Sequence, residues 1–392
     1  MDHMQASTKF NRIHFGLSIM LAGYLLLPGF RAIFKYFSYP SLICYLYLIF
    51  ASIFLLLLVN GKLEKIQKVI GSPLSISLFL VAVTITCWIA YPFADGLKLN
   101  TQGSDQDDCI ILGVNRILDF SHPYSEKTYF GNPCSPGPGL LLLYAPFVIL
   151  HIYILGAIAS IAAVVLSLHQ KRDDWNVAGL WLIALFSSLI IPELLTVGSD
   201  LVLLGNGIAF LAIALPDIIR NKNLTYAIYL SILCGLLASS RINFIVMAPL
   251  VSLFVFASWK NGGIIFFCVS MLVTFIPSLY IYYLDPTIFT PFHLAGKSAN
   301  IAGLQMLVCG AILSIGSTIY SALRVRIDSI FIPMGLFISL APMLLSVSLG
   351  DLYTRQWNIA AWDGANYLVP LIPLAALILV NSNAKRSGIK SN

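Results

Sequence analysis

Apolar runs of about 20 residues recur along the chain, and short polar segments separate them. A helix of that length rises about 30 Å, which matches the hydrocarbon core of a bilayer. The pattern predicts an all-α polytopic membrane protein with residues 1–392 as one transmembrane domain. We expect twelve spans, near residues 13–29, 41–59, 73–93, 138–168, 177–192, 201–219, 224–238, 244–257, 264–284, 301–322, 329–349 and 367–380. The spans 177–192, 224–238 and 244–257 are short, which is typical of re-entrant or broken helices.

The polar segments between the spans are unequal in length and charge. The longest covers residues 94–138, and two smaller ones cover 285–300 and 350–366. If the spans alternate in direction, most of the 23 lysines and arginines fall on the same side as the two termini. Basic residues accumulate on the cytoplasmic side of membrane proteins. We therefore expect both termini in the cytoplasm and these three segments outside.

Composition agrees with a membrane location: 58% of the residues are hydrophobic and only 10% are charged. The net charge of +6 fits basic anchors beside anionic lipid. No basic stripe interleaved with aromatic residues is present, so nucleic acid is not an expected partner.

The long outer segment has recognisable parts. Ile110, Ile111, Val114, Ile117 and Leu118 recur at helical spacing, which predicts a short amphipathic helix at the membrane surface. Before it, a serine at 104 and an aspartate at 107 resemble a capping box. After it come the sequence HPY (122–124) and the irregular run NPCSPGPG (132–139), which leads into the fourth span.

Three carboxylates, Asp105, Asp107 and Asp108, open this segment. Acidic residues stabilise a helix N-terminus, but one or two suffice, and three together repel one another. Three functions are open for such a cluster: a general base for a hydroxyl, a site for a divalent cation, or a site for a cationic substrate.

Basic residues near the outer surface are few. Arg241 lies in a tight hairpin (SSRIN), and Lys297 and Arg355 lie in the later outer segments. A half-buried arginine is best matched by an anion such as phosphate. His122 and His293 are also outside, but the six histidines are scattered and do not indicate a zinc site.

Other sequence signals are limited. The chain has no Walker loop, dinucleotide fingerprint, HExxH or GxSxG motif. Five of the seven cysteines lie in apolar spans. Cys109 and Cys134 are both in the long outer segment and either form a disulfide or are free thiols.

The order of these parts resembles the first outer loop of the C-type membrane glycosyltransferases (GT-C), which use polyprenyl-phosphate sugars. An acidic cluster, a surface helix, "HPY" and a Pro/Gly run lead into "LLLLYAPFVIL". The resemblance is closest to the bacterial mannosyl- and arabinofuranosyl-transferase-like branch and covers residues 94–138. It implies a GT-C-like fold and a place in the bacterial inner membrane. It also implies transfer of a sugar from a polyprenyl phosphate to a cell-envelope glycan or lipid acceptor on the periplasmic face.

The resemblance also implies roles for individual residues. The catalytic base would be Asp107, with Asp108 and Asp105 as the next candidates. The donor phosphate would meet Arg241, helped by other outer residues: Lys297, Arg355 and His293. Substrate-binding candidates are His122, Tyr124 and Trp357. No cofactor is implied, although the aspartates leave a divalent cation possible.

Two alternative functions remain open at this stage. An O-antigen polymerase or ligase has a similar size and works on the same face of the membrane. A flippase or transporter of lipid-linked glycans is the second alternative, but it should carry ionisable residues deep in its spans, and these spans have almost none.

Overall fold

The computed structural model describes residues 15–100, 103–292, 296, 299–300, 303–324 and 330–384. The described part of the chain is helical and contains no strand. Within it, eight helices are long and apolar enough to cross a membrane, or nine if one bent pair is counted. This confirms the predicted all-helical membrane class. By length and composition, the described residues contain fewer spans than the twelve that were predicted.

The eight long helices match predicted spans, with shifted ends. The first runs from Phe15 to Tyr36 and ends in α2 (Gly29–Tyr36). The others are α3 (Pro40–Val59), α5 (Pro73–Gly96) with the 3₁₀ turn η1 (Leu97–Asn100), α11 (Leu201–Asn221), α14 (Lys260–Leu284), α16 (Leu304–Leu323), α17 (Phe331–Thr354), and α18 (Ile372–Ala384) with the preceding 3₁₀ helix η5 (Asp363–Leu371).

Two predicted spans are broken. The predicted span 138–168 consists of α7 (Pro138–Ile149) and α8 (Leu155–Arg172), because His151 adopts a left-handed conformation with φ 56°. The predicted span 177–192 consists of α9 (Trp175–Phe186) and α10 (Ile190–Thr196), which are bent by 82°. Apolar residues flank His151, so hydropathy alone gives no sign of the first break, whereas Ser187 and Ser188 lie at the second.

The remaining helices are short. The predicted spans 224–238 and 244–257 correspond to α12 (Leu224–Ala238) and to η2 (Ile242–Phe244) with α13 (Met247–Ser258). A helix between α3 and α5, α4 (Glu64–Ile70), was not expected. The predicted surface helix is present as α6 (Asp108–Leu118), and short 3₁₀ turns form η3 (Thr290–Phe292) and η4 (Ile359–Ala361).

The helices form a bundle whose centre and periphery differ in burial. The most apolar stretches of α11 and of the η5–α18 span are 78% and 83% buried, whereas that of α5 is only 11% buried. The outward faces of the peripheral helices α3, α5, α14 and α16 carry exposed large apolar side chains, among them Phe50, Ile89, Leu279 and Ile312. Continuous apolar exposure of this kind is expected where a protein contacts lipid.

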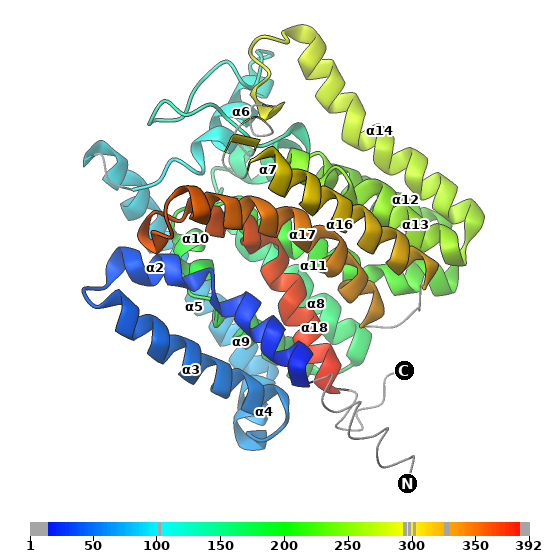
Figure 1. The fold of residues 1–392 in the computed structure, drawn as a ribbon. Helices are drawn as coiled ribbons and strands as arrows, with labels where there is room; N and C mark the ends of the chain where they lie inside the picture. Colours follow the sequence, from blue (N-terminus) through cyan, green and yellow to red (C-terminus); the bar gives the residue numbers. More distant parts are fainter. Residues whose placement is uncertain are drawn as a thin grey trace.

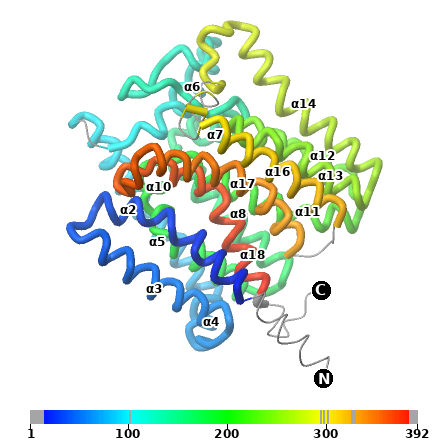
Figure 2. The backbone as a smooth tube through the Cα atoms, in the orientation of Figure 1, coloured from blue at the N-terminus to red at the C-terminus, as the bar shows by residue number. Residues whose placement is uncertain are grey.

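Figure 1 places α6 and the segment that precedes α7 together at the upper left of the bundle, whereas α4 lies at its lower end. The tube in Figure 2 shows the chain between α5 and α7 on the same side as the connection between α2 and α3. The predicted outer segments therefore contribute to one end of the molecule, and the candidate site is built there.

Candidate functional site

Two of the three predicted carboxylates, Asp107 and Asp108, pair with a lysine that had not been singled out from the sequence. Lys98, in η1, is buried, and its ammonium group forms ion pairs with Asp95, Asp107 and Asp108. One oxygen from each of these aspartates lies within 4.8 Å of the other two, a spacing at which carboxylates can share a metal ion. The lysine ammonium bonds all three carboxylates and so offsets part of their mutual repulsion.

Asp107 is fully engaged by its neighbours. Its Oδ1 accepts a hydrogen bond from Lys98 at 2.9 Å, and its Oδ2 accepts one from the hydroxyl of Tyr91 at 2.5 Å. Its side chain is only 2% exposed, and this burial raises the pKa of the carboxyl group above its usual value. Asp107 precedes α6 without capping it, and Ser104 instead accepts a hydrogen bond from the backbone N–H of Gln106 at 3.3 Å, so the expected capping box does not form.

Tyr91, which bonds Asp107, also packs against the turn at Gly198. A Cβ on Gly198, which has φ +68°, would lie 2.7 Å from the Tyr91 ring and 3.0 Å from the Tyr153 ring. The hydroxyl of Tyr153 donates to the carbonyl of Gly198 at 2.8 Å. The two tyrosines therefore support the tight turn that leads to Asp200, two residues later.

A disulfide ties α6 to the Pro/Gly run. Cys109, at the start of α6, is bonded to Cys134, with the two Cα atoms 5.1 Å apart. Of the two possibilities that the sequence left open, the structure shows the disulfide. The bond holds the two ends of the segment that includes HPY. Cys109 borders the cavity described below, and so do Pro133 and Ser135, the neighbours of Cys134.

The Pro/Gly run packs against the end of α12 at distances that only glycine permits. A Cβ on Gly137 would lie 1.9 Å from the carbonyl oxygen of Ser239, and one on Gly139 would lie 2.0 Å from the Ser239 hydroxyl oxygen. The backbone N–H of Gly137 donates to the carbonyl of Ser240 at 2.6 Å. This close contact fixes the hairpin that carries Arg241.

Arg241 is held from two sides. One of its terminal nitrogens donates to the Asp200 carboxylate at 2.6 Å, and the other donates to the hydroxyl of Ser135 at 2.9 Å. Asp200 is buried at the start of α11. The Nε of Arg241 is buried and has no hydrogen-bond partner among the described residues. Arg241 therefore retains donor capacity for a ligand.

A cavity of about 420 Å³ lies beside Arg241. One wall comes from the long outer segment and includes Asp105, Gln106 and Ser135. The charged residues on the rest of the lining come from distant parts of the chain: Arg31, Asp200, Arg241, Asp351, Arg355 and Asp363. Asp107 and Asp108 are not among the residues that border this cavity.

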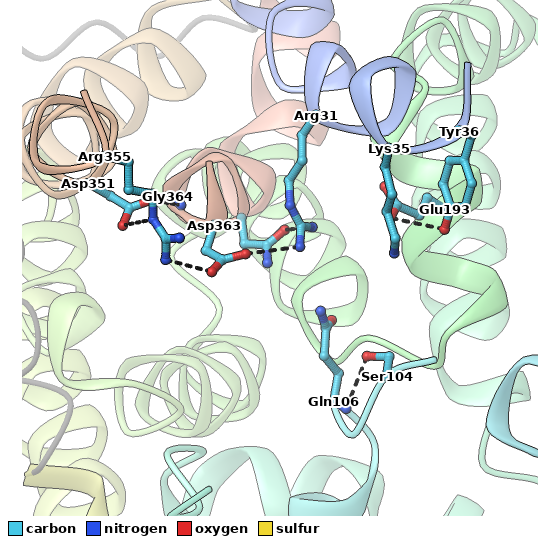
Figure 3. A network of polar contacts seen from close by, with 11 residues as sticks. Arg31, Lys35, Tyr36, Ser104, Gln106, Glu193, Asp351, Arg355, Asp363 and Gly364 are labelled. Carbon is cyan, nitrogen blue, oxygen red and sulfur yellow. Dashed lines mark hydrogen bonds and ion pairs between the residues drawn. The ribbon is translucent and has the colours of Figure 1, made fainter. Parts of the chain in front are cut away.

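Figure 3 shows part of the charged wall, on which Asp363 bridges two arginines. Its two oxygens lie 3.1 Å from Arg31 and 2.7 Å from Arg355. Arg355 also donates from Nε to Asp351 at 2.9 Å, and the second oxygen of Asp351 accepts the backbone N–H of Gly364 at 2.6 Å. All three arginines that border the cavity are thus paired with carboxylates.

Asp105 differs from the other acids that border the cavity. Its Oδ2 accepts a hydrogen bond from the Asn132 amide at 2.9 Å. In the part of the chain that the structure describes, it forms no ion pair. A carboxylate without a paired cation is the best placed of these acids to accept a proton.

An apolar groove of about 360 Å³ meets the polar cavity at Arg241. Its lining comes from the ends of α12 and α14 and from η3, and includes Phe275, Leu279, Tyr282 and Phe292. Arg241 borders both spaces. The site therefore offers a cation at the boundary between a polar chamber and an apolar channel.

Three predicted substrate-binding residues lie outside the cavity lining. Tyr124 is buried, and its hydroxyl donates to the carbonyl of Pro136 at 2.9 Å. A ring nitrogen of His122 lies 3.2 Å from the carbonyl oxygen of Ile281. Both residues hold the segment together. Trp357 is 63% exposed and follows the end of α17 with φ 62°. Of the donor-phosphate candidates, Arg241 and Arg355 border the cavity, while His293 and Lys297 lie outside the described residues.

The sequence analysis missed several residues of the site. The residues that were not singled out from the sequence are Arg31, Lys98, Asp200, Asp351 and Asp363. Each lies near one end of a predicted span, and all five fall on the side that was predicted to be outside, so a signal was present. Which of them meet depends on how the helices pack.

Comparisons with protein-family models, with curated proteins and with solved structures found no match to this chain.

Proposed function

We propose that this protein is a membrane glycosyltransferase of the GT-C type that works at the periplasmic face of a bacterial inner membrane. It would transfer a sugar from a polyprenyl phosphate to a cell-envelope glycan or lipid. The observation that supports this most directly is the position of Arg241 between the polar cavity and the apolar groove.

The proposed donor matches both spaces. A polyprenyl phosphate sugar has an apolar chain, an anionic phosphate and a polar sugar, in that order. The groove provides apolar surface for the first part of the chain, and the guanidinium of Arg241 suits the geometry of phosphate oxygens. The sugar then lies in the cavity, beside Asp105.

The proposed reaction is a displacement at the anomeric carbon. The acceptor hydroxyl gives its proton to the Asp105 carboxylate while its oxygen forms the new bond to the anomeric carbon. The bond from that carbon to the phosphate oxygen breaks, and the lipid phosphate leaves with the electron pair. Arg241 stabilises the negative charge that develops on this oxygen. Placing both substrates in one cavity supplies the entropic part of the acceleration.

The test uses full-length protein in nanodiscs with a panel of polyprenyl-phosphate sugars that includes mannose and arabinofuranose donors. We expect release of the free polyprenyl phosphate, measured by mass spectrometry, when membrane extract supplies the acceptor. Arg241→Gln should lower this release about 10²-fold or more, as expected for loss of a group that stabilises the leaving charge.

A matched control is Arg116→Gln. Arg116 lies in the same outer segment and pairs with Glu126, but it borders neither the cavity nor the groove. This variant should retain transfer. A wild-type protein that moves the donor between leaflets without cleaving it would contradict the proposal and favour a flippase.

A further inference from the structure

We infer that the wall formed by Arg31, Asp363 and Arg355 is the acceptor site and that it binds an uncharged, hydroxyl-rich group, a sugar residue of the acceptor. This inference rests on the proposed function, because it assigns the second substrate of the same cavity. It is independent of which aspartate acts as the base.

The first argument is position. Arg31, Asp363 and Arg355 border the same cavity as Arg241 but do not border the apolar groove. The groove and Arg241 serve the lipid and the phosphate of the donor. A cavity of about 420 Å³ has room for more than one sugar ring, which leaves the other wall for the acceptor.

The second argument is the charge on this wall. Two guanidinium groups, those of Arg31 and Arg355, face two carboxylates, those of Asp351 and Asp363. The charges cancel. A phosphate or carboxylate on the acceptor would have to approach the negative charge of Asp363, whose two oxygens already form ion pairs with Arg31 and Arg355. The wall is therefore a poor site for an anion.

The third argument is the mixture of donors and acceptors. The Asp363 side chain is 60% exposed although both of its oxygens are bonded, so lone pairs remain accessible. The amide of Asn366 accepts from Arg31 at 3.3 Å and also borders the cavity. A hydroxyl group both donates and accepts, and it can bond carboxylate and guanidinium groups together.

Gln106 adds an unsatisfied group to the same cavity. Its Oε1 is buried and has no partner among the described residues. Figure 3 shows Gln106 on a different segment from Arg31 and Asp363, with its side chain extending toward them. A buried amide oxygen needs a hydrogen-bond donor, and a hydroxyl of a bound sugar would supply one.

The experiment measures binding of octyl glycosides (mannoside, glucoside, galactoside and arabinofuranoside) to the full-length protein in nanodiscs by saturation-transfer NMR. We expect binding of at least one glycoside with wild-type protein. Asp363→Asn removes a charged acceptor, and Arg31→Lys removes the planar guanidinium that bonds Asp363 and Asn366 together, so each should weaken binding about tenfold or more. Two different variants are used so that poor folding of one does not decide the result.

Lys35→Gln is the matched control. Lys35 lies one turn after Arg31 on the same helix, pairs with Glu193 at 3.2 Å and does not border the cavity. Its substitution should leave glycoside binding unchanged. Equal binding by wild type, Asp363→Asn and Arg31→Lys would overturn the inference. So would tighter binding of octyl mannoside 6-phosphate than of octyl mannoside.

Two further readouts separate this inference from the proposed function. Where the wild type cleaves a donor, Asp363→Asn should raise the KM for the glycoside and leave the KM for the donor within about twofold, because the donor meets Arg241 instead. Where no donor is cleaved, the proposed function fails, and glycoside binding still decides whether this wall binds sugar.

Discussion

The ammonium group of Lys98 lies 2.9 Å from Oδ1 of Asp107, on the opposite side of the carboxylate from the Tyr91 hydroxyl. Both oxygens of the aspartate are therefore used in holding η1, α5 and the start of α6 together. This relationship explains why an apolar chain concentrates carboxylates in one place. Two of the three aspartates satisfy a buried lysine, and the third, Asp105, borders the cavity.

Asp105→Asn and Asp107→Asn should have different effects. Loss of the general base should lower sugar transfer by about 10²- to 10⁴-fold in Asp105→Asn with little change in thermal unfolding. Asp107→Asn leaves Lys98 and Tyr91 with a weaker acceptor and should cost about 1–3 kcal/mol of stability. Donor turnover and thermal unfolding in detergent measure the two effects. The opposite pattern, with transfer lost only in a well-folded Asp107→Asn, would return the base to Asp107.

Removing the lysine should convert the cluster into a cation site. Lys98→Met leaves three carboxylates whose oxygens lie within 4.8 Å of one another, so the protein should lose about 3–5 kcal/mol of stability. Millimolar Ca²⁺ should restore part of this loss, because hard cations bind clustered carboxylates. Thermal unfolding with and without Ca²⁺ tests this. The exposed Lys62→Met is the control, and an equal Ca²⁺ shift in both variants would contradict the prediction.

Loss of the disulfide should destabilise the outer segment. The bond between Cys109 and Cys134 has a sequence separation of 25 residues, for which chain entropy predicts a contribution of about 3–4 kcal/mol. Cys109→Ser should lower the unfolding temperature and reduce transfer, since Cys109 and both neighbours of Cys134 border the cavity. Cys268→Ser, a free cysteine on α14, should do neither. Thiol counting with a maleimide under denaturing conditions checks that the bond is present in the wild type.

Gly139→Ala should displace the hairpin that carries Arg241. The added methyl group would lie 2.0 Å from Oγ of Ser239 and 2.1 Å from the carbonyl oxygen of Leu236, so a backbone must move. We expect a loss of about 1–3 kcal/mol and lower affinity for farnesyl phosphate, a short polyprenyl phosphate. Gly316→Ala, where the new methyl group meets nothing within 4 Å, is the control. Unchanged lipid-phosphate binding in Gly139→Ala would show that this contact does not position Arg241.

The orientation can be measured by cysteine labelling. Ser121 is exposed in the long outer segment, and Asn60 is exposed in the turn after α3. A membrane-impermeant maleimide should label Ser121→Cys in intact cells and Asn60→Cys only after permeabilisation. This follows from the excess of basic residues on the side of Asn60. Labelling of Ser121→Cys only after permeabilisation would place the cavity in the cytoplasm and remove the periplasmic enzyme proposed above.

The sequence by itself determined the helical membrane class, the positions of most spans and the surface helix α6. These features depend on local composition and period, which can be read from neighbouring residues. The break at His151 escaped this approach because the residues on both sides of it remain apolar. The sequence also identified Arg241 as a half-buried cation that needs an anion.

Only the tertiary structure decided which carboxylate faces the cavity. Asp105 and Asp107 are two residues apart and equivalent in the sequence, but one borders the cavity and the other bonds Lys98 and Tyr91. The pairing of Arg31 with Asp363 joins residues 332 positions apart. Such contacts depend on how helices from both ends of the chain pack together, and no local pattern records that packing.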